Sequence, residues 1–237
     1  MNKFSQRSNQ KELLDRDDIP FEDIKQNMKE LDFINTWLGG HAITIKGIES
    51  LVKLSAFQLS HKLTICEMGC GGGDNLRAIG KWCKERDISV ILIGIDMNPN
   101  CIAYARSRKD NFDIDFISDD YRNVHFETKP DVIFSSLFCH HFTNEELEQQ
   151  FAWMKQNAKL GFFVNDLQRH PLAYYAIKWL TQLFSKSYLV KNDAPLSVLR
   201  GFSKNEWHAI FQQSNIQSFS LKWKWAFRWL LTYKHEQ

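Results

Sequence analysis

Short apolar runs alternate with helical patterns from about residue 61 onward. The apolar runs predict strands over 63–68, 90–95, 112–117, 132–137 and 160–164. The segments between them predict helices over 74–86, 98–106, 144–157 and 172–184. The run Val90–Ile95 is apolar at nearly every position, which is typical of a central parallel strand covered by helices on both faces. The pattern therefore predicts an α/β fold with a doubly wound sheet.

The first sixty residues have a different pattern. Apolar side chains recur at three- and four-residue steps over 24–38, which predicts a helix that ends at a Gly-Gly pair. A second helix is expected over 44–59. We therefore predict an N-terminal helical cap over 1–60 and a single domain over 61–237.

The C-terminal segment predicts a helix at 204–214 followed by two strands, 216–225 and 227–233. In the first strand two tryptophans alternate with two lysines, so one face would be aromatic and the other cationic. Such a pattern can also mark a nucleic-acid or membrane surface. A half-buried strand pair near the sheet edge explains the same spacing and is favoured.

Composition excludes several classes of protein. The chain has 237 residues with 30 Lys+Arg and 28 Asp+Glu, which is ordinary for a globular protein. Its apolar runs are too short to span a bilayer, and the polar N-terminus carries no export signal, so a cytoplasmic protein without a transmembrane segment is expected. The five cysteines show no disulfide framework and are expected to be reduced. Cys66 and Cys70 lack a second ligand pair, so no metal is assigned.

Charge is concentrated in the last third of the chain. Residues 171–237 carry 9 basic and 3 acidic side chains, a net charge of +6. An acidic substrate, a carrier protein, anionic lipid or nucleic acid would be attracted to such a surface, but a solvated basic face is the favoured interpretation.

A glycine-rich loop carries the clearest chemical signal. The segment Glu67–Asp74 follows the first predicted strand directly, precedes a helix, and contains Gly-x-Gly-x-Gly. Without Cβ atoms, such a backbone can approach a ligand closely. Asp96 closes the next apolar run, where a carboxylate suits the two hydroxyls of a ribose. Together these residues predict a cofactor that contains adenosine.

Two classes of enzyme bind such a cofactor at this position. The dinucleotide fingerprint Gly-x-Gly-x-x-Gly fails here, because its third glycine falls on Asp74 or Leu76 in the two possible registers. A nicotinamide-dependent oxidoreductase is therefore disfavoured and kept as an alternative. A second alternative is a non-catalytic protein that binds RNA or membrane through its basic, Trp-rich C-terminal segment.

The loop resembles the acid-x-Gly-x-Gly-x-Gly motif of class I S-adenosylmethionine-dependent methyltransferases. The segments Ile117–Asp120 and Asp131–Leu137 resemble that family's third and fourth strand ends, in the same order. The resemblance implies a Rossmann-like, seven-stranded sheet with an antiparallel last strand, and S-adenosylmethionine as cofactor. The cofactor-binding residues that it implies are Glu67, Gly69, Cys70, Gly71, Gly73, Asp96, Met97, Asp119, Asp120, Ser135 and Leu137.

A further resemblance, to bacterial small-molecule methyltransferases of polyketide and quinone pathways, covers the N-terminal helices that end in Trp37–Gly40 and the segment from Asn165–Leu167 through 192–196. It implies a small hydrophobic, aromatic acceptor such as a phenol, resorcinol or quinone precursor, with no nucleic-acid partner. The insertion 167–203 is expected to form a substrate lid. Its aromatic residues would either line the acceptor pocket or pack in the core: Tyr174, Tyr175, Trp179, Phe184 and Tyr188.

The expected reaction needs alignment and a proton acceptor. The methyl group is already activated on a sulfonium, so no nucleophile and no metal are required, and O-methylation is favoured over C-methylation. A phenol with a pKa near 10 benefits from a general base. His140 and His141 follow the fourth strand, and His170 follows the fifth, so these three are the candidate bases. Asp166 would orient such a histidine or cap the next helix.

Overall fold

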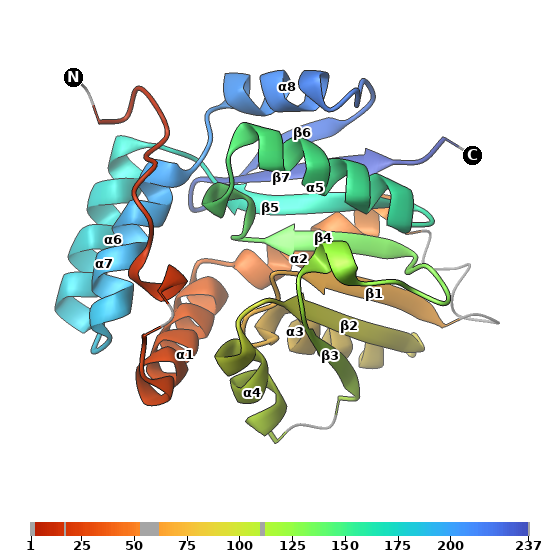
Figure 1. Ribbon diagram of the computed structural model, residues 1–237, viewed down its shortest axis with the longest axis horizontal. Helices are drawn as coiled ribbons and strands as arrows, with labels where there is room; N and C mark the ends of the chain where they lie inside the picture. Colours follow the sequence, from red (N-terminus) through yellow and green to blue (C-terminus); the bar gives the residue numbers. More distant parts are fainter. Residues whose placement is uncertain (1–2, 17, 53–61, 110–111, 237) are drawn as a thin grey trace.

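The computed structural model describes residues 3–16, 18–52, 62–109 and 112–236. Their centre is one seven-stranded sheet with the strand order β3-β2-β1-β4-β5-β7-β6 (Figure 1). Strands β1 to β5 are parallel, and β7 runs antiparallel to both β5 and β6. The strands are β1 (Leu63–Met68), β2 (Val90–Asp96), β3 (Ile114–Ser118), β4 (Val132–Ser136), β5 (Gly161–Leu167), β6 (Ser220–Lys224) and β7 (Arg228–Lys234). The Rossmann-like fold with an antiparallel last strand is thus confirmed.

Helices cover both faces of the sheet. The α-helices are α1 (Phe21–Trp37), α2 (Gly40–Leu51), α3 (Asp74–Lys84), α4 (Pro99–Ser107), α5 (Asn144–Asn157), α6 (Pro171–Phe184), α7 (Tyr188–Arg200) and α8 (Lys204–Gln213). One buried cluster joins α2 and α3 to the sheet, and it includes Ile48 and Leu76. A second joins α5 and α8 to the opposite face and includes Phe151 and Trp207, and a smaller third one lies between α1 and α4. The sheet therefore separates two apolar cores.

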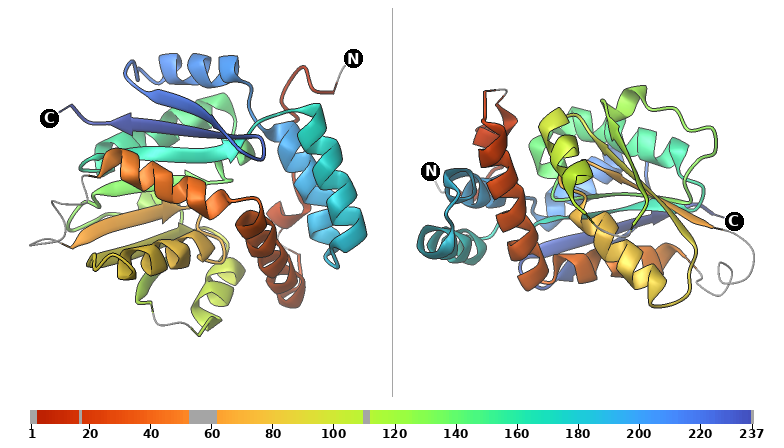
Figure 2. Two further views of the ribbon diagram at one scale, coloured as in Figure 1. Left: turned by 180° about the vertical axis from the view of Figure 1, so that it is seen from behind. Right: turned by 90° about the horizontal axis from the view of Figure 1, so that it is seen from below.

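The helices α1, α6 and α7 gather at one end of the sheet (Figures 1 and 2). This is the end at which the parallel strands finish, where open α/β sheets bind ligands. The chain before α1 runs along α7 and forms a short 3-10 helix there, Leu13–Asp15. Helix α2, by contrast, packs on β5 and β7. The domain boundary at residue 60 stays a prediction.

Two helices differ from the expectation. Helix α7 was not predicted, because Pro195 lies inside it and proline usually interrupts a helix. The segment that the sequence analysis treated as a lid therefore consists largely of two packed helices, α6 and α7. The second N-terminal helix begins four residues earlier than expected and ends at Leu51, and the expected continuation over 53–59 lies outside the described residues.

The C-terminal hairpin is shorter and more exposed than expected. Its turn includes Ala226 and Phe227, both with positive φ. The expected strand pair at the sheet edge is present, but Trp223 in β6 and Trp225 just after it are 51% and 72% exposed, so the tryptophan side of β6 is not buried. The physical reason is that β6 is the edge strand of the sheet, with only β7 as a neighbour among the described strands. Among the described helices, none is both long and apolar enough to cross a membrane.

Candidate active site

A cavity of about 1610 Å³ lies at the carboxyl ends of the parallel strands. Its walls come from the ends of β1, β2 and β4, from the N-terminal segment, and from α1, α6 and α7. Ligand pockets usually measure about 300–1,000 Å³. The cavity therefore has room for a cofactor together with a second molecule.

The glycine-rich loop forms one wall of this cavity. Gly69, Gly71 and Gly73 all have positive φ, which glycine adopts without strain. A Cβ on Gly69 would lie 2.2 Å from the Phe138 ring, whereas one on Gly71 would meet only Met28 Sδ, at 3.5 Å. The loop is therefore packed against protein at Gly69 and open towards the cavity at Gly71, as a cradle for a ligand requires.

Glu67 lies at the end of β1, is buried, and lines the cavity. Its Oε1 accepts a hydrogen bond of 2.8 Å from Asn75 Nδ2, while Oε2 has no partner in the described part of the chain. Burial raises the pKa of this carboxyl well above its usual value. An unpartnered buried oxygen at a cavity wall suits a ligand that donates a hydrogen bond.

Asp96 is the last residue of β2, and two backbone N–H groups hold its carboxylate in place. Its Oδ2 accepts from Gly71 N and its Oδ1 from Asn98 N, both at 2.8 Å. Burial raises the pKa of Asp96, although the two backbone hydrogen bonds oppose that rise. Each oxygen keeps a lone pair for a further donor, as recognition of a ribose diol needs. The two carboxylates and the open loop thus fit an adenosine-containing cofactor.

The other predicted cofactor-binding residues divide into two groups. Those that line the cavity are Gly69, Cys70, Gly71, Met97, Asp119, Asp120 and Leu137. Gly73 and Ser135 do not line it: Gly73 is the residue before α3, and Ser135 is buried with its Oγ 3.4 Å from Cys139 Sγ. Asp120 also forms an ion pair with Arg122, which holds the pKa of Asp120 below its usual value. The binding roles of all these residues stay predictions.

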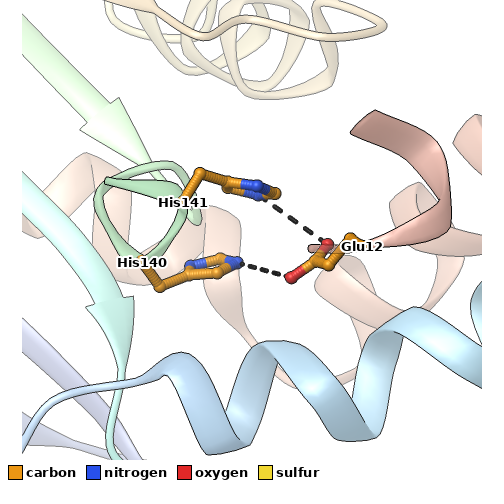
Figure 3. Close-up of side chains that lie close together, drawn as sticks. All are labelled: Glu12, His140 and His141. Carbon is orange, nitrogen blue, oxygen red and sulfur yellow. Dashed lines mark ion pairs between the residues drawn. The ribbon is translucent and has the colours of Figure 1, made fainter. Parts of the chain in front are cut away.

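His140 is the centre of a buried ionic cluster. Its Nδ1 lies 2.7 Å from Asp166 Oδ1, and its Nε2 lies 3.5 Å from Glu12 Oε1 (Figure 3). Burial alone would lower the pKa of His140, but the two carboxylates outweigh it and raise the pKa to about 9. Burial would likewise raise the pKa of Asp166, and His140 lowers it instead. At neutral pH, His140 is therefore a cation between two anions.

His141 extends from the same turn and lines the cavity. Its Nε2 lies 3.8 Å from Glu12 Oε2, and its Nδ1 lies 3.2 Å from Asp15 Oδ1. Its side chain is 22% exposed, against 3% for His140. Of the two adjacent histidines, His141 is the one that a ligand in the cavity reaches more easily.

Glu12 and Asp15 had no place in the sequence analysis, because the N-terminal segment carries no recognisable motif. Arg200 fixes that segment and the histidine turn together, because it donates to the carbonyl oxygens of Gln10, His140 and His141 at 2.6, 3.0 and 2.8 Å. The N-terminal segment thus completes the site from more than a hundred residues away in the sequence.

His170 lies elsewhere. Its Nδ1 accepts a hydrogen bond of 3.2 Å from Leu172 N, at the start of α6, and its ring stacks on Phe227 at 4.7 Å. It does not line the cavity. The structure therefore brings His140, His141 and Asp166 together and leaves His170 as the cap of α6; its catalytic role stays a prediction.

The remaining walls are largely apolar. Helix α6 contributes Ala173, Ala176, Ile177 and Leu180 to the cavity, whereas none of the five aromatic residues expected in the insertion lines it. Four of the five lie on α6 outside its cavity-facing positions, and Tyr188 begins α7. An apolar acceptor suits these walls.

A metal ion would find donors here as well. The ligand atoms of Glu12, His140 and His141 lie within 4.8 Å of one another. Metal ligation needs an unprotonated imidazole, so an ion would have to displace the proton that Asp166 and Glu12 hold on His140.

The fold and the cavity define the class of protein: a Rossmann-like α/β protein with the architecture of class I methyltransferases. Residues 65–161 match the family model described as a methyltransferase domain. The chain therefore carries a methyltransferase domain over these residues, as the glycine-rich loop and the strand-end motifs predicted. No sequence match was found among curated proteins.

Solved structures share this fold. The plantazolicin methyltransferase BpumL in complex with SAH has a TM-score of 0.56 at 18% identity, over 85% of this chain and 78% of that chain. Magnesium protoporphyrin IX methyltransferase (ChlM) from Synechocystis PCC 6803, with bound SAH, has a TM-score of 0.53 at 13% identity, over 86% and 88%. Human N-acetylserotonin methyltransferase in complex with SAM has a TM-score of 0.60 at 18% identity, over 92% and 57%. At these identities the likeness establishes the fold.

Proposed function

We propose that this protein transfers the methyl group of S-adenosylmethionine to an oxygen of a small, largely apolar, aromatic acceptor. The observation that carries this proposal is that one cavity joins the open glycine loop and Asp96 to a histidine-carboxylate cluster and to the apolar wall of α6. The cofactor is the one that the family implies and that the similar structures hold, as S-adenosylmethionine or its demethylated product.

The residues of the chain position the two reactants. Asp96 would accept from the ribose hydroxyls, and the free Oε2 of Glu67 would accept from a further donor of the cofactor. S-Adenosylmethionine, when bound, supplies a methyl group that is already activated. Alignment of acceptor oxygen, methyl and sulfur is then the main contribution of the protein, up to about 7–11 kcal/mol in favourable intramolecular reactions.

His141 is the general base in this proposal. His140 holds its proton up to a pKa of about 9, so it cannot accept another at neutral pH. It serves instead as a fixed cation that orients Glu12, which in turn faces His141. A phenolic hydroxyl with a pKa near 10 would lose its proton to His141 as the methyl group is transferred. A cytoplasmic location completes the proposal, and the five cysteines are all free and buried.

Calorimetric titration tests the cofactor assignment. The purified protein is titrated with S-adenosylmethionine, S-adenosylhomocysteine and NADPH. Binding of the two sulfur ligands, and its loss in Gly71→Arg, is the expected result, because an arginine side chain would fill the open side of the loop. The exposed Asp113→Ala serves as a matched control and should bind normally. Binding of NADPH alone would support the oxidoreductase instead.

A methyl-transfer assay tests the acceptor. Phenols, resorcinols and hydroquinones are incubated with methyl-labelled S-adenosylmethionine, and the labelled product is identified as an ether or a C-methyl compound. Label on oxygen is expected. Label on ring carbon would contradict the O-methylation part of the proposal, and retention on RNA without cofactor binding would favour a non-catalytic role.

A further inference from the structure

Arg228 is a buried cation without a hydrogen-bond partner at the cavity wall. It is the first residue of β7, opposite Leu167 of β5, and it is 2% exposed. Among the described residues, neither its Nε nor its Nη1 has a hydrogen-bond partner. Arg228 is also among the residues that line the cavity, so an unsatisfied cation lies in its wall.

Such an arrangement is energetically unfavourable by itself. A buried guanidinium loses its hydration, which costs several kcal/mol unless an anion and acceptors replace the water. Burial lowers the pKa of Arg228 to about 10, so the group still carries its charge at neutral pH. Asp166 is the carboxylate that favours this charge, but its Oδ1 is already engaged by His140 at 2.7 Å.

Two other buried arginines, Arg169 and Arg200, have hydrogen-bond partners. Arg169 donates to Gly201 O at 2.6 Å and forms an ion pair of 2.7 Å with Glu206. Arg200 donates to three backbone carbonyls. Arg200 lines the cavity as Arg228 does, so Arg228 differs from these two arginines in the missing partners of its Nε and Nη1 within the described part of the chain.

The position of Arg228 in the sheet favours the acceptor over the cofactor. Most of the predicted cofactor residues lie at the ends of β1, β2 and β3, with Ser135 and Leu137 at the end of β4, whereas β7 lies three strands beyond β1 in the order β1-β4-β5-β7. At a strand spacing of about 4.8 Å, that is about 14 Å across the sheet. The cavity residues on this side are largely apolar, including Phe227 and Leu167 next to Arg228 and Ile177 of α6.

We propose that Arg228 binds a carboxylate of the methyl acceptor, so that the substrates of this enzyme are largely apolar phenols that also carry a carboxylate, rather than neutral phenols. A guanidinium can donate two parallel hydrogen bonds to one carboxylate, which gives both charge pairing and orientation. Ile177 and the other small apolar residues of α6 then contact the body of the acid. This inference rests on the proposed function, because the second ligand of the cavity is taken to be the acceptor.

Binding of simple carboxylic acids tests whether Arg228 recognises a carboxylate. The protein saturated with S-adenosylhomocysteine is titrated by calorimetry with benzoate and cinnamate, and with benzamide and cinnamamide as neutral counterparts. The wild type should bind each acid at least tenfold more tightly than its amide. Arg228→Met should abolish that preference while the affinity for S-adenosylhomocysteine stays within twofold. Lys222→Met, an exposed cation on the same hairpin, should behave as wild type.

The outcomes separate this inference from the proposed function. If the wild type shows no preference for the acids, or if Arg228→Met retains the preference, the carboxylate site is overturned. The same holds if Arg228→Met loses S-adenosylhomocysteine binding instead, since Arg228 would then serve the cofactor. If the wild type binds neither sulfur ligand, the proposed function fails, whatever the acids do. Arg228→Lys, which keeps a charge without the two-pronged geometry, provides a second variant and should weaken the preference.

Discussion

His140 Nδ1 lies 2.7 Å from Asp166 Oδ1, and both side chains are buried. This contact ties the turn after β4 to the end of β5, and Glu12 adds the N-terminal segment from the other side of the ring at 3.5 Å. Three parts of the chain are therefore held by one protonated imidazole. The stability of the site should depend on that proton.

Stability should fall as the pH rises from 6.5 to 9. The pKa of His140 is raised from 6.5 to about 9 on folding, so its contribution is fully present below 6.5 and is lost as the pH passes 9. The change corresponds to about 3 kcal/mol. Urea denaturation of the wild type and of His140→Gln, at pH 6 and pH 9, measures this change in the free energy of unfolding.

The variant serves as the internal control for this pH dependence. His140→Gln should be less stable than the wild type at pH 6, and its stability should change much less between the two pH values. Equal slopes for the two proteins would show that another group is responsible.

Replacement of His141 should lower kcat more than that of any other histidine near the cavity. A positioned general base contributes about 10²–10⁴ in rate, so His141→Ala should reduce kcat by about that factor with a small change in KM. His170→Ala should reduce kcat less than twofold, because His170 caps α6 outside the cavity. Steady-state kinetics over pH 6–10 separates the roles, since activity of His141→Ala should recover at high pH as the acceptor ionises.

Two glycines with similar backbone conformations allow the cofactor cradle to be tested. Gly71 and Gly39 have φ of +50° and +73°, and an added Cβ meets at most one sulfur atom at either site. Each change to alanine should cost about 1–2 kcal/mol of stability. Only Gly71→Ala should also weaken S-adenosylmethionine binding, by about tenfold. Equal cofactor affinity in both variants would place the cofactor elsewhere.

The sheet could be predicted because its strands are short apolar runs with clear boundaries. Buried parallel strands are apolar on both faces, so the sequence signal survives without knowledge of the tertiary contacts. Helix α7 escaped prediction because Pro195 is tolerated there by the packing of α7 on α6, which the local sequence does not reveal. The exposure of Trp223 likewise depends on which strand ends up at the sheet edge.

The candidate site was predictable only where its residues follow strand ends. The turn with His140 and His141 follows β4, and Asp166 lies in β5, so the strand order brings them together. Glu12 reaches the same place through a segment held by hydrogen bonds from side chains far away in sequence. Arg228 was not identified because its significance lies in a missing partner, which only the packed structure reveals.

Removal of metal should leave methyl transfer unchanged. Glu12, His140 and His141 could ligate an ion, but His140 keeps its proton up to a pKa of about 9 and is therefore a poor ligand at neutral pH. Dialysis against EDTA, followed by metal analysis and assay at pH 7, should show full activity. Loss of activity that zinc or iron restores would establish a metal site at this cluster.

Asp193 should hold the N-terminal segment closed over the cavity. Its two carboxylate oxygens accept from Leu13 N and Leu14 N at 2.8 and 3.0 Å, and this fixes the short helix that carries Asp15 next to His141. Asp193→Ala removes both acceptors, so the segment should open more often and raise KM for the acceptor. Limited trypsin digestion should then cleave after Lys11 several times faster than in the wild type, while Asp113→Ala, an exposed change, should leave the rate unaltered.

If Asp193→Ala resists trypsin as well as the wild type, the N-terminal segment is held chiefly by Arg200 and the rest of its hydrogen bonds. KM for the acceptor should then be unchanged.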